Sequence, residues 1–241
     1  MFVLEGRTAL IFGGRTGIGA AVGSLFEQAG ARVLIADLFD KSEIAENNRD
    51  ALFCDVSDKK NVEQVVDVAI QRLGHIDILI NNAGVGTPAQ DVQDIPTDVW
   101  SKVFAVNVAG SLFALQAVIP HMINRGYGRI INTASQLAHK PAPKQSAYSA
   151  SKAALVAMTV SIAQEVASKG ITVNCVCPGP TGTNMWHGSD PNWKDWKTEQ
   201  LPIRRIGTAD EIASAYLYLA SDAASFMIGQ SISPNGGDVM W

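Results

Sequence analysis

Residues 7–19 of this 241-residue chain read Arg-Thr-Ala-Leu-Ile-Phe-Gly-Gly-Arg-Thr-Gly-Ile-Gly. The apolar run at 7–12 has the length of a buried strand, and apolar residues at helical spacing follow the glycines over 20–29. A strand, a glycine turn and a helix in this order let the backbone approach a pyrophosphate, which the helix N-terminus faces with free N–H groups. The stretch therefore predicts the first unit of a dinucleotide-binding fold. Taken alone, the glycines have an alternative interpretation as an ordinary strand-to-helix turn.

Strand-like and helix-like segments continue to alternate along the chain. We expect further strands at 31–36, 50–54, 75–80, 129–133, 171–176 and 230–233, and further helices at 58–73, 108–124, 148–168 and 208–220. Such alternation is typical of an α/β fold, here a single doubly wound Rossmann-type domain over residues 1–241. We expect a parallel sheet of about seven strands with helices on both faces. Residues 183–200 read as irregular.

Composition excludes several classes of protein. Apolar residues make up 47% of the chain, which argues against disorder, and a net charge of −4 argues against a nucleic-acid partner. We expect no membrane span, because no stretch of about 18 uninterrupted apolar residues occurs. Residues 1–7 do not resemble a signal peptide, so a cytoplasmic location is expected. Cys54, Cys175 and Cys177 read as small core residues, and the four isolated histidines predict no catalytic metal.

Three residues in the middle of the chain indicate a reaction. Tyr148 and Lys152 lie four residues apart, which places a phenol and an ammonium on one face of a helix. Ser135 follows the predicted strand at 129–133. A phenol beside a fixed cation can exchange a proton with an alcohol or carbonyl oxygen. A surface helix with a chance Tyr–Lys pair is the alternative.

Candidate site residues share a place in the predicted sheet, since ligands of doubly wound sheets bind beyond the carboxyl ends of the strands. The residues that follow proposed strand ends are Gly13, Asp37, Asp55, Asn82, Ser135 and Pro178.

The chain resembles the classical short-chain dehydrogenases/reductases over essentially its whole length. The resemblance is carried by Gly13-x-x-x-Gly17-x-Gly19, Asp55-Val56, Asn81-Asn82-Ala83-Gly84, Asn107, Ser135, Tyr148-x-x-x-Lys152 and Pro178-Gly179. Each motif alone is modest, whereas their order and spacing together are specific. The chain departs from the family at Phe12, where a threonine is usual.

The resemblance implies a role for each of four catalytic positions. Tyr148 would be the general acid/base, and Lys152 would lower its pKa and bond the nicotinamide ribose. Ser135 would hold the substrate oxygen, and Asn107 would order a water molecule in a proton relay. An alternative for Asn107 is that it satisfies buried backbone carbonyls.

The resemblance also implies a set of cofactor-binding residues. They are Gly13, Arg15, Thr16, Gly17, Ile18, Gly19, Asp37, Leu38, Asp55, Val56, Asn82, Ala83, Gly84, Tyr148, Lys152, Pro178, Gly179, Thr181 and Thr183. Asp37 can accept hydrogen bonds from both ribose hydroxyls of NAD and would repel a 2′-phosphate, so NAD is the predicted cofactor. Arg15, which could reach such a phosphate, is the counterargument.

The predicted substrate site involves Ser135, Gln136, Leu137, Tyr148, Met185 and Trp186, with residues 183–200 as a lid. Trp186, Trp193 and Trp196 in this lid indicate an apolar, cyclic or aromatic substrate, although the rings could instead pack the lid onto the body. The resemblance implies a homotetramer, with a homodimer as the alternative.

The sequence thus predicts an NAD-dependent dehydrogenase or ketone reductase for a small, largely apolar secondary alcohol or ketone. One alternative is an NADPH-linked 3-oxoacyl-thioester reductase of the same fold. A more distant alternative is a non-catalytic regulator that binds a dinucleotide. The full set of Asn107, Ser135, Tyr148 and Lys152 argues against the regulator, because a sensor does not need a tyrosine base.

Overall fold

The computed structural model of the chain describes residues 3–39, 50–188 and 190–240, which contain a parallel sheet of seven strands. The strand order β3-β2-β1-β4-β5-β6-β7 and the all-parallel pairing confirm the predicted doubly wound α/β fold. The strands are β1 (Thr8–Phe12), β2 (Arg32–Asp37), β3 (Asp50–Phe53), β4 (Ile78–Asn81), β5 (Gly128–Thr133), β6 (Ile171–Val176) and β7 (Ser231–Ile232).

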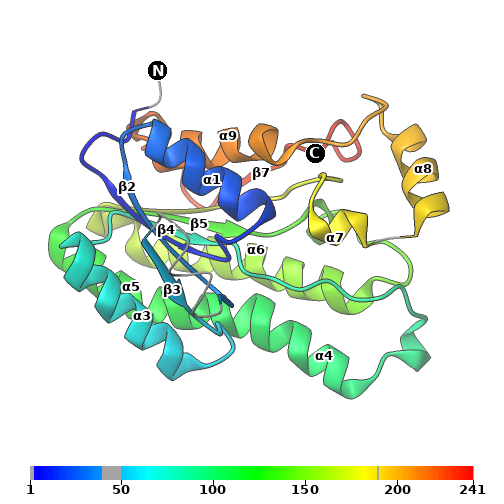
Figure 1. The fold of residues 1–241 in the computed structure, drawn as a ribbon, viewed down its shortest axis with the longest axis horizontal. Coiled ribbons are helices and arrows are strands. Elements are labelled where there is room, and N and C mark those ends of the chain that lie inside the picture. The colour runs from blue at the N-terminus through cyan, green and yellow to red at the C-terminus, as the bar shows by residue number, and fades with distance from the viewer. Residues whose placement is uncertain (1–2, 40–49, 189, 241) are drawn as a thin grey trace.

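Helices cover both faces of the sheet (Figure 1). The helices α1 (Gly17–Gln28) and α9 (Ala209–Ala220) pack together on one face. The other face carries α3 (Lys59–Leu73), α5 (Gly110–Arg125) and α6 (Ser146–Val166), and α4 (Thr97–Phe104) packs against α6. Strands β1, β4, β5 and β6 are buried along their whole length, as expected of strands covered on both sides.

Local signals in the sequence begin and end several of these helices. The Asp58 side chain accepts hydrogen bonds from the backbone N–H groups of Lys60 and Asn61 at the start of α3. Thr208 and Glu211 form a capping box at the start of α9. Gly74, with a φ of 85°, ends α3 in a conformation that favours glycine.

The helix predicted at 108–124 is longer in the structure. A continuous helical segment runs from Thr97 to Arg125, with a π-helical turn, η2 (Ala105–Ala109), between α4 and α5. This 29-residue segment is long and apolar enough to cross a membrane by length and composition alone, and 39% of its most apolar window is buried. Its α5 portion packs against α3, β4 and β5. The absence of a membrane span stays a prediction.

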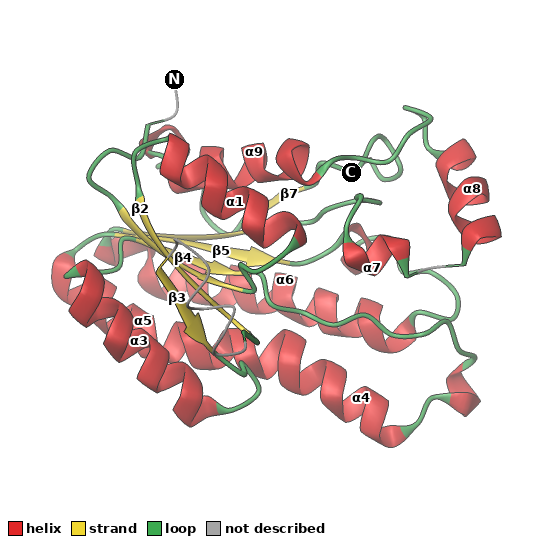
Figure 2. Cartoon of the chain, in the orientation of Figure 1, coloured by secondary structure: helices red, strands yellow, loops and turns green. Residues whose placement is uncertain are grey.

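Residues 183–200, which read as irregular, form two helices, so that interpretation was wrong. They are α7 (Asn184–His187) and α8 (Pro191–Gln200), both visible in Figure 2 at one end of the molecule. The Asp190 side chain caps α8 by accepting from the Trp193 N–H, and Pro191 occupies the first helical position. This Asp-Pro signal was present in the sequence. The remaining short helices are η1 (Val92–Asp94), η3 (Gln136–Ala138), η4 (Ala167–Lys169) and η5 (Asp222–Ala224).

A buried polar ladder ties the middle of the sheet to α6. Asn81 and Asn132 are partners in the β4–β5 register, and the Asn81 Nδ2 donates to Asn132 Oδ1 at 2.9 Å. Asn132 Nδ2 donates in turn to the Thr159 hydroxyl on α6, also at 2.9 Å. Because α6 carries Tyr148 and Lys152, this ladder fixes the height of that helix above the sheet.

Candidate active site

The glycine turn lies between β1 and α1, as the sequence predicts. Gly13 and Gly17 adopt positive φ values of 81° and 58°, which favour glycine. The Asn82 side chain donates to the Gly13 carbonyl at 2.7 Å and so holds the turn against the end of β4. Thr16 precedes α1 without a side-chain capping bond, which leaves the first N–H groups of the helix available to an anion. The turn therefore has the donor chemistry that a pyrophosphate needs.

The Asp37 carboxylate lies beside this turn, at the end of β2. Its Oδ2 accepts from the Arg15 backbone N–H at 2.9 Å, and its Oδ1 accepts from the Leu38 N–H at 2.7 Å. The Arg15 guanidinium donates to the Leu38 carbonyl at 3.1 Å. The Arg15 guanidinium, which could reach a 2′-phosphate, thus lies close to the Asp37 carboxylate, which favours NAD.

Asp55 and Val56 follow β3, the edge strand that pairs with β2 next to Asp37. Asp55 Oδ1 accepts from both the N–H and the hydroxyl of Ser57, at 2.9 and 2.7 Å, which is the role of a turn residue. Val56 is buried, and a Cβ atom on Gly110 would come within 2.9 Å of its carbonyl oxygen. Contact of either residue with an adenine ring stays a prediction.

Ser135 and Tyr148 are brought together by β5 and α6. The Ser135 hydroxyl lies close enough to the Tyr148 phenol to lower the pKa of that phenol, although the two residues are 13 positions apart in the sequence. Ser135 is buried, and its oxygen also accepts from the Leu137 N–H at 3.1 Å. The serine hydroxyl is therefore fixed next to the phenol.

Lys152 completes the group from one turn further along α6. Its ammonium lies 5.8 Å from the centre of the Tyr148 ring and donates to the Thr133 carbonyl at 2.7 Å. Burial lowers the pKa of Lys152 to about 8. The sequence did not predict the Thr133 carbonyl as a partner of Lys152. The position of Thr133 at the end of β5 is the one feature of the sequence that could have indicated it.

The pKa of Tyr148 differs from the sequence-based expectation. We expected Lys152 to lower it, whereas in the chain itself burial raises the pKa of Tyr148 above its ordinary value, against a smaller lowering by the Ser135 hydrogen bond. A positive charge in addition to these side chains is needed to favour the phenolate.

Asn107 lies in the π-helical turn η2 and is fully buried. Its Oδ1 accepts from the Val85 N–H at 2.8 Å, and its Nδ2 donates to the Val85 carbonyl at 3.1 Å and to Ser151 Oγ at 3.0 Å. The Ser151 hydroxyl donates to the Tyr148 carbonyl. Asn107 thus satisfies buried backbone groups, as its alternative interpretation held, and joins the segment after β4 to the helix of Tyr148. Its role in a water relay stays a prediction.

We expect Asn107→Ala to lower the free energy of unfolding by about 2 kcal/mol, because it leaves the partly buried N–H and carbonyl of Val85 without their Asn107 partner and removes a fully buried side chain. Denaturant unfolding of both proteins measures the change. Ser57→Ala, which removes an exposed hydroxyl bonded only to Asp55, is the control and should change stability by less than about 0.5 kcal/mol. Equal stability of the Asn107 variant and the parent would contradict this assignment.

The segment after β6 connects the cofactor and substrate sides of the candidate site. The Pro178 carbonyl accepts from the Gln136 N–H at 3.0 Å, and the Thr181 hydroxyl donates to the Gly179 carbonyl at 2.8 Å. Thr183 reaches the glycine turn, since a Cβ atom on Gly17 would lie 3.2 Å from its methyl group. These residues therefore join the serine side of the site to the glycine turn.

Apolar side chains of α7 and α8 lie above this end of the sheet. Met185 contacts the loop after β4, since a Cβ atom on Gly86 would lie 3.5 Å from its sulfur. Trp186 and Trp193 pack at 5.4 Å between ring centres. Met185, Trp193 and Trp196 remain 52, 45 and 55% exposed. Trp186 and Trp193 thus pack between α7 and α8, while Trp196 is largely exposed.

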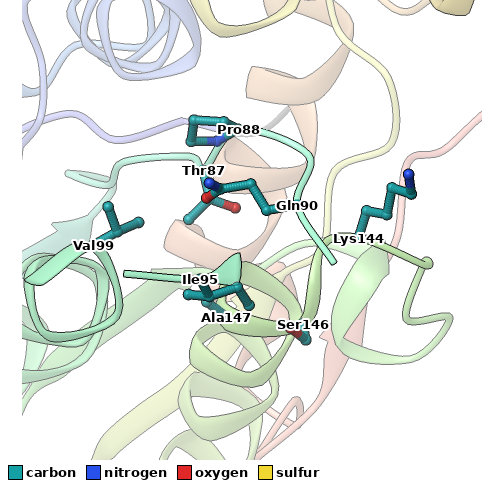
Figure 3. A pocket seen from close by; sticks show the side chains of 8 residues that line it. All are labelled: Thr87, Pro88, Gln90, Ile95, Val99, Lys144, Ser146 and Ala147. Atoms are coloured by element: carbon teal, nitrogen blue, oxygen red, sulfur yellow. The ribbon is translucent and has the colours of Figure 1, made fainter. Parts of the chain in front are cut away.

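A shallow hollow lies between the loop after β4 and the start of α6 (Figure 3). Its lining includes Thr87, Pro88, Val99, Lys144 and Ala147, and Ala147 directly precedes Tyr148. Among residues 3–39, 50–188 and 190–240, no group of three or more His, Cys, Asp or Glu side chains could hold a metal ion. The hollow therefore adjoins the start of the helix that carries Tyr148.

Comparisons with known proteins agree with this geometry. The family described as "Enoyl-(Acyl carrier protein) reductase" matches residues 13–238. The chain is 36% identical to the 3-oxoacyl-[acyl-carrier-protein] reductase FabG of Thermotoga maritima, over 98% of the chain and 99% of the relative. It is 37% identical to 3beta-hydroxysteroid dehydrogenase 2 of Eggerthella lenta, over 98% of the chain and 95% of the relative. The crystal structure of levodione reductase superposes with a TM-score of 0.92 at 28% identity, covering 97% of this chain and 98% of that one.

Proposed function

Because the chain belongs to the short-chain dehydrogenase/reductase family, we propose that it transfers hydride between NAD(H) and a small, largely apolar secondary alcohol or ketone. Membership of the family makes it an oxidoreductase that acts on CH–OH groups with a nicotinamide dinucleotide. One observation carries the proposed chemistry, which is the meeting of the Ser135 hydroxyl, the Tyr148 phenol and the buried ammonium of Lys152 at one place.

Oxidation of a secondary alcohol removes a hydride from carbon and a proton from oxygen. A bound nicotinamide supplies the hydride acceptor. The Tyr148 oxygen takes the proton, and in the reverse reaction it returns that proton to the forming alcohol. The Ser135 hydroxyl donates to the substrate oxygen as charge develops on it, and the Lys152 ammonium together with the positive charge of an oxidised nicotinamide would favour the phenolate.

The residues at the carboxyl ends of β1, β2 and β4 fit a dinucleotide. Gly13, Arg15, Thr16, Gly17, Ile18 and Gly19 would surround the pyrophosphate at the open N-terminus of α1. Asp37 and Leu38 would meet the ribose of the adenosine. Asp55 and Val56 would meet the adenine, and Asn82, Ala83 and Gly84 would line the adenosine side of the cofactor. Tyr148, Lys152, Pro178, Gly179, Thr181 and Thr183 would hold the nicotinamide half.

We expect kcat/KM with NAD to exceed that with NADP by at least about tenfold. The Asp37 carboxylate, which the backbone N–H groups of Arg15 and Leu38 hold in place, would accept hydrogen bonds from the ribose hydroxyls and would oppose a 2′-phosphate at the same place. Steady-state rates with the two cofactors at matched concentrations measure the preference. In Asp37→Ser the preference should reverse, because the carboxylate that would repel a 2′-phosphate is removed while the Arg15 guanidinium, which donates to the neighbouring Leu38 carbonyl, is kept. Equal or better turnover of the parent with NADP would reject NAD as the cofactor.

The proposed substrate class rests on the apolar side chains Met185, Trp186, Trp193 and Trp196 of the lid. We infer that residues 183–200, of which Ser189 lies outside the described residues, close over the substrate, with Gln136 and Leu137 forming the wall beside Ser135. Two similar proteins carry the names of a hydroxysteroid dehydrogenase and levodione reductase, which supports a cyclic substrate. A panel of cyclic, aromatic and aliphatic secondary alcohols tests this proposal.

Reduction of a 3-oxoacyl thioester with NADPH is the second candidate function. It is favoured by the 36% identity to the 3-oxoacyl-[acyl-carrier-protein] reductase of Thermotoga maritima. Acetoacetyl-CoA with NADPH tests it directly. Faster turnover of that pair than of every NAD–alcohol pair in the panel would replace the first proposal with the second.

We also propose that copies of the chain associate as a homotetramer, with a homodimer as the alternative. Ile123 on α5 and Val160 on α6 are 39 and 41% exposed on the helix layer, where a second copy would bury them. Sedimentation velocity distinguishes the monomer, dimer and tetramer.

A further inference from the structure

The Asp238 carboxylate occupies an unusual position for an acidic residue near the C-terminal end of the chain. Its side chain is only 5% exposed and receives three side-chain donors. These are the amide of Gln136 and the ammonium groups of Lys197 and Lys140, at 2.5, 2.5 and 3.1 Å. Two cations and an amide N–H thus converge on one carboxylate.

The three donors come from the parts of the chain that border the reacting group. Gln136 directly follows Ser135, and the N–H of Leu137, one residue further, donates to the serine oxygen. Lys140 lies just beyond η3, and Lys197 lies on α8 of the proposed lid. The cluster therefore adjoins the site where the substrate oxygen would be held.

The chemistry of this cluster is that of a carboxylate-binding site. Ammonium groups and an amide N–H are the donors that bind carboxylates through short, charge-assisted hydrogen bonds. Burial acts to raise the pKa of Asp238, but the bonds from Lys197, Lys140 and Gln136 outweigh it and hold that pKa below its ordinary value. The chain's own side chain thus fills the site as an anion.

The amide of Gln136 is oriented by the same carboxylate. Its Nε2 must face Asp238, because the opposite orientation would place two acceptor oxygens against each other. Its Oε1 is consequently buried without a hydrogen-bond partner. Asp238 therefore determines how the pocket wall next to Ser135 presents its polar atoms.

We propose that Asp238 is a specificity-determining residue, whose carboxylate fills a carboxylate-binding subsite beside Ser135 and so restricts the enzyme to uncharged alcohols and ketones. A substrate that carries its own carboxylate meets a donor set that already binds the Asp238 carboxylate. This inference rests on the proposed function, because it concerns which alcohols reach Ser135 and Tyr148.

The test compares cyclohexanol with 3- and 4-hydroxycyclohexanecarboxylate as substrates of the parent and of Asp238→Ala. The variant leaves both ammonium groups available, so the ratio of kcat/KM for the better hydroxy acid to that for cyclohexanol should rise by at least about tenfold. An unchanged ratio would overturn the proposal. An equal loss on both substrates would also overturn it, because Asp238 would then serve only to fasten α8.

Two lysine variants on α8 provide matched controls in the Asp238→Ala background. Adding Lys197→Met removes a donor of the subsite and should abolish most of the gain on hydroxy acids. Adding Lys194→Met removes a lysine of the same helix that donates to the His187 carbonyl at 3.4 Å, and it should leave the gain intact. Equal effects of the two changes would contradict a specific subsite.

Binding of benzoate gives a readout that does not depend on turnover. Trp193 and Trp196 lie on α8 close to Lys197 in sequence, so their fluorescence reports an anion bound there. We expect the dissociation constant for benzoate to be at least about tenfold lower in Asp238→Ala than in the parent. Equal constants would refute the subsite. Failure of the proposed function would instead appear as absent NAD-linked oxidation of cyclohexanol by the parent, with the benzoate difference retained.

Discussion

Tyr148→Phe is expected to lower kcat by at least about 1,000-fold, while the dissociation constant for NADH changes by less than about threefold. The substitution removes one oxygen, which lies beside the Ser135 hydroxyl, and keeps the ring beside the Lys152 ammonium. Neither Ser135 nor Lys152 can replace that oxygen, because the serine hydroxyl is far less acidic and the ammonium already donates to the Thr133 carbonyl. Absorbance of the reduced nicotinamide measures turnover, and its fluorescence measures binding.

Tyr127→Phe is the matched control for this variant. The Tyr127 hydroxyl donates to Asp222 at 3.3 Å beside Arg129, which lies near the start of β5 rather than at its carboxyl end. Loss of that phenol should leave kcat within about twofold of the parent, since it does not touch the candidate site. Turnover retained by Tyr148→Phe would remove Tyr148 from the mechanism, and a large loss of NADH binding would make its role structural.

The fold could be predicted because the sequence signals that specify its strands and helices are local. Strands β1, β2 and β4 are short, mostly apolar runs, and each glycine or capping residue lies next to the element that it begins or ends. The residues after the strand ends then follow from topology, because parallel strands place their carboxyl ends at one edge. The meeting of Ser135 with Tyr148 is a consequence of that rule, although the two belong to different elements.

Features that the sequence did not reveal depend on contacts between distant residues. The π-helical turn at Asn107 is stabilised by bonds to Val85 and Ser151, which no local pattern indicates. The pKa of Tyr148 depends on burial, which the spacing of Tyr148 and Lys152 does not measure. Asp238 meets Gln136 across 102 positions of sequence, so its role beside the site appears only in three dimensions.

Gly19→Ala is expected to weaken NADH binding by about 100-fold. A Cβ atom at this position would lie 1.9 Å from the Gly13 carbonyl oxygen and 2.6 Å from the Asn82 amide nitrogen. The first neighbour is backbone, so the glycine turn must move away from α1 and from the Asn82 side chain that holds it. Overpacking of this kind costs about 1–3 kcal/mol, and about 2.8 kcal/mol corresponds to 100-fold in a dissociation constant.

Gly182→Ala separates this effect from the general cost of adding a methyl group near the site. A Cβ atom on Gly182 would have no neighbour closer than 3.5 Å, at the Ile206 side chain, and its backbone does not adopt a positive φ. NADH fluorescence should therefore give nearly the parent dissociation constant for Gly182→Ala, and thermal unfolding should show whether Gly19→Ala remains folded. Parent-like NADH binding by a folded Gly19→Ala protein would mean that the cofactor does not depend on the close packing of this turn, because the methyl group cannot fit without displacing it.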